Sequence, residues 1–256
     1  MLALIRLTWW QALRHPTSLL VAGLAAVALL LSWTFGAFNF EDQDRLRLLA
    51  TSGVAVSRLS ALFLAALLAS TIVHDELSGR TAHTLFAKPL GRTDYLFGRS
   101  LGIWLAIGCL VALLAAAHAG LLAATASMGF PGMPQGRLLP ELWLPWQRLL
   151  QAHALVWAES ATLTALATVL ALRLPLITNL LLLVTLFVGI NLAAAADIHA
   201  LGILPSLGLF GIDDSLQFVE AHVPATYFAL SLTYAALYAC GLLLMGAAWF
   251  QRQDIP

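Results

Sequence analysis

The chain has 256 residues, of which 61% are hydrophobic and only 10% are charged, and its mean hydropathy is +0.87. A soluble domain usually carries about 25% charged residues, so this composition excludes an ordinary soluble enzyme and predicts an all-α integral membrane protein. The 13 basic and 13 acidic residues balance, which leaves no basic excess for binding nucleic acid, and the two cysteines lie in apolar runs without a metal-binding spacing.

The first 15 residues are too few to cross a membrane, and we expect them to form a helix at the interface between lipid and water. On a helical wheel one face is apolar and is made of Leu2, Ile5, Trp9 and Leu13. The other side is largely polar and carries Arg6, Gln11 and Arg14. Such a helix lies in the membrane plane with its tryptophans at the depth of the headgroups.

Windows of about 20 mostly apolar residues predict six membrane-spanning helices. They lie near residues 17–38, 49–73, 99–127, 149–172, 174–196 and 226–250. An even number of spans places both termini on one side of the membrane. Basic residues near spans are retained in the cytoplasm. Cytoplasmic termini put eight of them inside, namely Arg6, Arg14, Arg80, Lys88, Arg92, Arg99, Arg173 and Arg252. The four that fall outside are Arg45, Arg47, Arg137 and Arg148.

A long polar stretch joins the second and third predicted spans. Residues 74–100 read HDELSGRTAHTLFAKPLGRTDYLFGRS, and with cytoplasmic termini residues 74–99 form the only substantial cytoplasmic loop. Ser78, or the acidic pair Asp75 and Glu76, is expected to cap a short helix that continues to about Ala87 and ends before Pro89. From hydropathy alone the stretch is equally well a simple inner loop whose cations follow the topology rule.

The outer connection at residues 197–224 has a different character. It is too apolar for a solvated loop, and glycine and proline interrupt it too often for one regular helix. We therefore expect short helices that enter the membrane partway before the last span, because irregular backbone is tolerated there only when protein covers it.

Two charged side chains fall inside predicted spans. Arg58 lies in the second span and Glu159 in the fourth, where a charge such as that of Arg costs at least about 2.5 kcal/mol. Each is about ten residues, or roughly 15 Å, from the outer end of its predicted span. His118 in the third span lies at a similar depth, so we expect one polar layer of Arg58, His118 and Glu159 that faces the bundle interior. We predict that Arg58 pairs with Glu159, and we favour structural pairing over contact with substrate.

Smaller polar side chains within the spans are expected to form hydrogen bonds between helices. They are Ser160, Thr162, Thr164, Asn179 and Asn191. A GxxxG pattern at Gly98 and Gly102 would allow another helix to approach closely, although this pattern is also frequent by chance.

Eight residues in and after the polar loop follow the spacing E-x-x-G-x-T-x-x-x-L-x-x-x-P-x-x-R-x-x-x-x-x-G followed by Lys or Arg. They are Glu76, Gly79, Thr81, Leu85, Pro89, Arg92, Gly98 and Arg99. Together with six spans, an amphipathic N-terminal helix and re-entrant outer helices, this pattern resembles the ABC-2-type permeases, the membrane subunits of one class of ABC exporters. Within them it looks closest to the group linked to maturation of multi-copper enzymes, including nitrous oxide reductase. Many members have lysine where this chain has Arg99.

The resemblance implies one permease domain over residues 1–256 that is not itself an enzyme. Residues 76–92 would pass the movement of a separate ATPase subunit to the spans, and the coupling residues implied are Glu76, Gly79, Arg80, Thr81, Leu85, Phe86, Pro89 and Arg92. The chain's single lysine, Lys88, is not part of a GxxxxGK phosphate-binding loop, so ATP and Mg are expected on the partner subunit. This chain is expected to bind no cofactor, metal or nucleic acid.

The resemblance also implies an assembly of two permeases, identical or different, in the cell inner membrane, with two ATPases bound to them. Lipid surrounds the permeases, and a periplasmic accessory protein is a possible further partner. The substrate stays open among a lipid-like molecule, a peptide, and a sulfur or copper-related species. One alternative is an ion-coupled secondary transporter in which Arg58 and Glu159 are the coupling groups. Another is an intramembrane haem or metal protein, for which His118 and His153 are the only histidine pair in adjacent spans.

Overall fold

The computed structural model describes residues 1–35, 42–78, 91–128, 146–196, 204–217 and 223–252, which contain helices and no strand. Six of the helices are long and apolar enough to cross a membrane, which is the pattern of a multi-pass membrane protein and confirms the six predicted spans. They are α2 (Pro16–Phe35), α3 (Asp42–Ala69), α6 (Arg92–Met128), α7 (Trp146–Ala171), α8 (Leu176–Ala195) and α10 (Ala225–Gln251).

Proline marks the start of three of these helices. Pro16 is the first residue of α2, and Pro175 and Pro224 immediately precede α8 and α10. Proline suits these positions because the first amides of a helix have no partner within the helix, so its missing N–H group costs nothing there.

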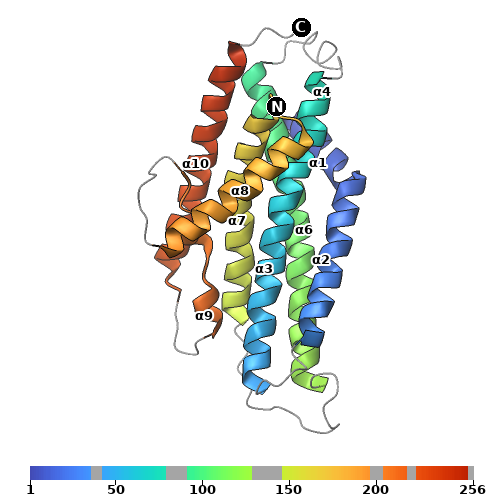
Figure 1. Cartoon of the computed structure of the whole chain (residues 1–256), viewed down its shortest axis with the longest axis vertical. Helices are drawn as coiled ribbons and strands as arrows, with labels where there is room; N and C mark the ends of the chain where they lie inside the picture. Colours follow the sequence, from blue (N-terminus) through green and yellow to red (C-terminus); the bar gives the residue numbers. More distant parts are fainter. Residues whose placement is uncertain (36–41, 79–90, 129–145, 197–203, 218–222, 253–256) are drawn as a thin grey trace.

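The centre of the bundle is formed by α3 and α7. Their most apolar windows are each 67% buried, whereas those of α2, α8 and α10 are 17%, 22% and 22% buried. Figure 1 shows α2 and α10 on the flanks, and α8 runs obliquely across α7 and α3. Most positions in the middle of α3 and α7 are therefore enclosed by protein.

The N-terminal helix α1 (Leu2–Arg14) packs against the beginning of α6. Its buried residues are Leu4, Thr8 and Ala12, one turn apart along one face. Gly98 and Gly102 make room for them, since a Cβ atom at Gly102 would lie 2.5 Å from the Cβ of Thr8. The apolar face expected from the helical wheel lies beside this packed face, so that Trp9 and Leu13 are only partly buried.

The second span does not end where the polar loop was expected to begin. After α3 the chain continues through a π-helical turn (Ser70–His74) into α4 (Asp75–Ser78). The expectation that Asp75 and Glu76 cap a new helix is wrong, because the backbone of Asp75 is helical (φ −67°, ψ −33°) and an N-cap residue has non-helical angles. The remainder of the predicted loop helix, residues 79–90, lies outside the described residues.

The segment before the last span contains short helices. A 3₁₀ turn (Leu207–Phe210) is followed by α9 (Asp213–Gln217). Leu207, Phe210 and Leu216 are buried against the bundle, where the segment contacts α3, α7 and α8. In Figure 1 this segment lies beside the part of α7 that is remote from the N-terminus. We refer to the described residues 204–217 as the outer segment.

Candidate functional site

An ion pair joins the two central helices near their middles. Arg58 Nε lies 2.9 Å from Glu159 Oε2, which confirms the predicted pairing. The Glu159 side chain is 1% exposed and that of Arg58 is 16% exposed. Because α3 begins at Asp42 and α7 at Trp146, Arg58 is 16 residues and Glu159 is 13 residues from these helix starts, about 24 and 20 Å. The pair is thus further from the helix ends than the predicted spans indicated.

Arg58 also holds the outer segment. Its Nη2 group donates a hydrogen bond to the carbonyl oxygen of Phe210 (3.1 Å), and its Nη1 lies 3.6 Å from Asp213 Oδ2. Two further side chains donate hydrogen bonds to carbonyl groups of this segment. Arg148 Nη1 donates to Ser215 O at 2.8 Å, and the Tyr227 hydroxyl donates to Leu209 O at 2.7 Å. The irregular backbone is therefore anchored by side chains of α3, α7 and α10.

The histidine predicted to share the layer of Arg58 and Glu159 belongs to a separate cluster. His118 Nδ1 lies 3.1 Å from His153 Nε2, and His118 Nε2 lies 3.0 Å from the carbonyl oxygen of Leu49. His153 and Glu159 are six residues apart on α7, so the histidine pair lies about 9 Å further toward the Trp146 end of that helix. The structure thus has two polar levels in place of the single layer that we expected.

The hydrogen-bond partners fix the tautomers of the two histidines. A carbonyl oxygen only accepts, so His118 carries its proton on Nε2 and accepts on Nδ1 from His153 Nε2. The 3.1 Å contact between the two ring nitrogens is that of a packed hydrogen-bonded pair. Among the described residues there is no group of three or more His, Cys, Asp or Glu side chains that could hold a metal ion.

The other polar residues of the spans bond mainly within their own helices. Asn179 is the exception: its Nδ2 donates to Ser70 Oγ (2.9 Å) and to Ala167 O (3.1 Å), linking α8 to the π-helical turn and to α7. Asn191 donates to Phe187 O in its own helix. Ser160 and Thr162 likewise bond to carbonyl groups one turn earlier, and Thr164 Oγ1 has no hydrogen-bond partner among the described residues.

Two motif residues, one on each side of residues 79–90, meet in a network around the buried side chain of Arg99. Arg99, whose side chain is 2% exposed, forms an ion pair with Glu76. Its Nη1 group also donates to Thr8 Oγ1 (2.9 Å) and to Gln11 Oε1 (3.2 Å) of α1, and the Tyr95 hydroxyl donates to Glu76 Oε2 (2.9 Å). We refer to these five residues as the loop-base network.

A further loop residue contacts the end of the last span. Arg92 Nη1 donates to the carbonyl oxygens of Phe250 (2.7 Å) and Gln251 (3.1 Å) in the last turn of α10. A cation at this place favours the helix, because the terminal carbonyl groups lack partners and carry partial negative charge. Arg92 and Glu76 thus both contact other spans. The other implied coupling residues, Gly79, Arg80, Thr81, Leu85, Phe86 and Pro89, lie outside the described residues.

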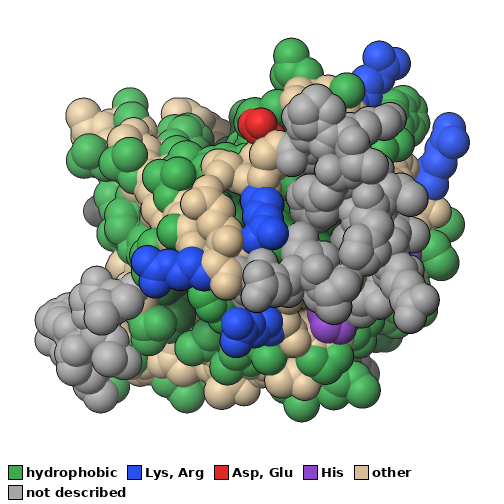
Figure 2. Space-filling view, turned by 90° about the horizontal axis from the view of Figure 1, so that it is seen from above, with side chains coloured by type: hydrophobic (Ala, Val, Ile, Leu, Met, Phe, Trp, Pro, Cys, Tyr) green, Lys and Arg blue, Asp and Glu red, His purple; other side chains and the backbone are tan. Residues whose placement is uncertain are grey.

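The end of the molecule that carries the loop-base network is rich in arginine. Figure 2 looks onto this end and shows arginine side chains spread over it, with little acidic surface beside them. The described arginines at this end are Arg6, Arg14, Arg92, Arg99, Arg173 and Arg252. Those near the opposite ends of the helices are Arg45, Arg47 and Arg148.

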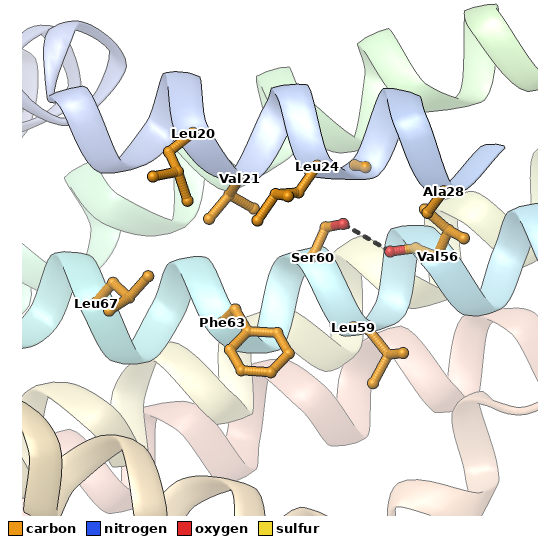
Figure 3. A pocket seen from close by; sticks show the side chains of 10 residues that line it. Leu20, Val21, Leu24, Ala28, Val56, Leu59, Ser60, Phe63 and Leu67 are labelled. Carbon is orange, nitrogen blue, oxygen red and sulfur yellow. Dashed lines mark hydrogen bonds between the residues drawn. The ribbon is translucent and has the colours of Figure 1, made fainter. Parts of the chain in front are cut away.

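A groove of about 330 Å³ lies between α2 and α3. It is lined almost wholly by aliphatic and aromatic side chains, among them Leu20, Leu24 and Phe63 (Figure 3). Ser60 is its one polar side chain, and the Ser60 hydroxyl already donates to Val56 O at 2.7 Å. The groove therefore offers contact to hydrocarbon and has no chemical group with which to act on a substrate.

Arg58, Glu159, Glu76 and Arg99 were all identified from the sequence as candidate site or motif residues, but several of their partners were not. Asp213 and the Phe210 carbonyl group come from the outer segment, and Tyr95 was not singled out. Comparison with models of known protein families gives no match for this chain, and comparison with curated protein sequences gives none either.

Proposed function

We propose that this chain is the membrane subunit of an ABC-2-type exporter that couples ATP hydrolysis on a separate subunit to export or to extracytoplasmic enzyme maturation. The observation that carries this proposal is the loop-base network together with Arg92. Both ends of the loop at residues 79–90 are tied by side chains to other helices, so that a displacement of the loop would be passed on to the spans.

The connections reach four parts of the bundle. Glu76 lies at the end of the second span and Arg99 near the start of the third, and Arg99 binds α1 through Thr8 and Gln11. Arg92 binds the end of α10. Breaking a buried ion pair by removing one partner typically costs about 3–5 kcal/mol, so these joints resist separation when the loop is pulled or pushed. A partner that grips the loop would move α1, the second and third spans and α10 together.

The charge pattern supports cytoplasmic termini in an inner membrane. The described arginines are more numerous at the end of α1 and α10 than at the opposite end, as the positive-inside rule requires. The contacts of α1 fit an interfacial position, since one face packs on α6, the adjacent face carries Trp9 and Leu13, and Arg6 and Arg14 are exposed beyond it.

The outer segment supports a re-entrant arrangement. Its 3₁₀ turn reaches Arg58, about 24 Å along α3 from the outer helix end, and its carbonyl groups are satisfied by protein side chains. Irregular backbone at membrane depth needs this kind of cover. A second permease copy, surrounding lipid and a periplasmic accessory protein complete the proposed assembly, and ATP and Mg are bound by the ATPase.

The test is copurification from native membranes of the full-length tagged chain, followed by measurement of ATP hydrolysis. We expect an ATPase to be retained by the wild type and lost when Leu85 is replaced by Asp or Pro89 by Ala. Leu113→Ala is the matched control, because Leu113 is 61% exposed on α6, remote from the loop, and should retain the ATPase. A wild-type chain that transports substrate with no ATPase bound would contradict the proposal.

The alternative of an ion-coupled secondary transporter is favoured by one observation, the buried pair of Arg58 and Glu159 at the bundle centre. It predicts substrate movement in proteoliposomes that contain this chain alone and an ion gradient without ATP. The exporter proposal predicts no movement under those conditions until the ATPase and ATP are added.

A further inference from the structure

Two carboxyl groups share one guanidinium group at the bundle centre. Arg58 Nε faces Glu159 Oε2 at 2.9 Å, and Arg58 Nη1 faces Asp213 Oδ2 at 3.6 Å. In the described part of the chain, Arg58 from α3 and Asp213 from α9 are the charged groups that act on Glu159, and the other helices packed on α7 contribute none. With both carboxyl groups ionised, this cluster would carry one uncompensated negative charge.

The two carboxyl groups differ in their exposure. The side chain of Asp213 is 44% exposed at the surface of the chain, whereas that of Glu159 is 1% exposed. Glu159 Oε1 is buried and has no hydrogen-bond partner among the described residues. A buried carboxylate oxygen that accepts no hydrogen bond is strongly unfavourable, and carboxyl groups that share one site commonly hold one proton between them.

We propose that Glu159 is a proton-binding site, with the proton carried on Oε1, and that its occupancy controls how firmly the outer segment is held on Arg58. Binding of the proton removes the surplus negative charge, and no other ion is needed to make the cluster neutral. The exposed carboxyl group of Asp213 marks the open side of the cluster, by which a proton would enter.

The link to the outer segment follows from the three partners of Arg58. When Glu159 is neutral, the full charge of Arg58 is available to Asp213 and to the Phe210 carbonyl group, and both of these belong to the outer segment. When Glu159 is ionised, it competes for the same guanidinium group. Proton uptake therefore strengthens docking of the outer segment, and proton release weakens it. The inference does not depend on the presence of an ATPase.

Proton occupancy can be observed directly by infrared difference spectroscopy on the full chain in lipid nanodiscs. We expect the wild type to show the carbonyl band of a protonated carboxylic acid that disappears when the pH is raised. The band should be absent in Glu159→Gln and retained in the matched control Asp44→Asn, which removes an exposed carboxyl group paired with Arg47. A band that persists in Glu159→Gln, or its absence from the wild type, would overturn the proposal.

A second variant keeps the test decisive if Glu159→Gln does not assemble. Asp213→Asn removes the competing carboxylate and leaves Arg58 to balance Glu159 alone. The cluster is then neutral without a proton, so we expect the band to be lost at a pH at which the wild type still shows it. An Asp213→Asn band that titrates like the wild-type band would show that the two carboxyl groups do not share one site.

Docking of the outer segment can be followed with a disulfide. A Cβ atom at Gly208 would lie 3.8 Å from the Cβ of Ala194 in α8, which matches the spacing of a disulfide. The experiment uses a background with Cys109 and Cys240 replaced by serine and compares two proteins that carry the pair Gly208→Cys/Ala194→Cys, one with Glu159 and one with Glu159→Gln. We expect the cross-linking rate of the first, divided by that of the second, to fall as pH rises. This ratio removes the pH dependence of thiol chemistry. A ratio that stays constant would refute the link.

Discussion

Replacing Gly53 by alanine tests how tightly the histidine pair is packed. Gly53 on α3 faces the ring of His118, and a Cβ atom there would lie 2.5 Å from His118 Nδ1 and closer still to two further ring atoms. The ring is held at 3.1 Å from His153 Nε2 and at 3.0 Å from Leu49 O. A methyl group at this position must therefore displace the ring and break both hydrogen bonds.

The cost can be estimated from these contacts. Overpacking a close-packed site costs about 1–3 kcal/mol. Losing two hydrogen bonds adds about 2 kcal/mol, and the better helix propensity of alanine returns about 1 kcal/mol. We therefore expect Gly53→Ala to lower the free energy of unfolding by about 2–4 kcal/mol. Gly120→Ala is the matched control, since an added Cβ atom there meets nothing within 4 Å, and it should be neutral or stabilise by up to about 1 kcal/mol.

The assay is reversible unfolding by SDS in mixed micelles, followed by tryptophan fluorescence. A double-mutant cycle isolates the clash. In a His118→Ala background the ring is gone, so Gly53→Ala should be neutral or stabilise by up to about 1 kcal/mol, and the coupling energy should equal or exceed the single-variant cost. Equal stability of Gly53→Ala and Gly120→Ala would refute the reasoning. So would a cost for Gly53→Ala that is the same with and without His118.

Three further predictions concern the other polar contacts. Arg99→Met should lower the free energy of unfolding by about 3–5 kcal/mol in the same assay, because it removes the ion pair with Glu76 and the hydrogen bonds to α1. A fully stable variant would contradict the network. Asn179→Leu should lower the free energy of unfolding by about 1–3 kcal/mol, because two hydrogen bonds between helices are lost. Asn191→Leu loses only a bond within its own helix and should stay close to the wild type. Equal costs for the two variants would contradict this assignment. Arg92→Ala should speed amide hydrogen exchange in the last turn of α10 and lower the free energy of unfolding by at most about 1 kcal/mol. Unchanged exchange would mean that the contact of Arg92 with the end of α10 is unimportant.

The spans and the central ion pair could be predicted because each rests on a local property of the sequence. Apolar runs of sufficient length identify the helices, and the cost of a lone charge in hydrocarbon requires a partner for Arg58, which Glu159 supplies. The distance of this pair from the helix ends was underestimated because hydropathy windows omit the polar first turns. The helices begin at Asp42 and Trp146, before the apolar runs.

The contacts of α1 and of the histidine pair could not be predicted in the same way. A helical wheel ranks faces by hydrophobicity, but Thr8 is buried because Gly102 on another helix leaves space for it and because Arg99 needs an acceptor. His118 was expected level with Arg58 and Glu159, but it contacts His153 and the Leu49 carbonyl group instead. Such complementarity between distant segments leaves no periodic signal in one sequence.

The order of synthesis gives the central ion pair a consequence for membrane insertion. Arg58 leaves the ribosome 101 residues before Glu159, about 5–20 s earlier at ordinary translation rates. During that interval the second span carries a charge that costs about 2.5–3.5 kcal/mol at the bilayer centre and has no acidic partner from the fourth span. Release of the second span into lipid is therefore more favourable after the fourth has arrived than before it. Holding the two helices together until then would avoid this cost, which the uncharged first span does not carry.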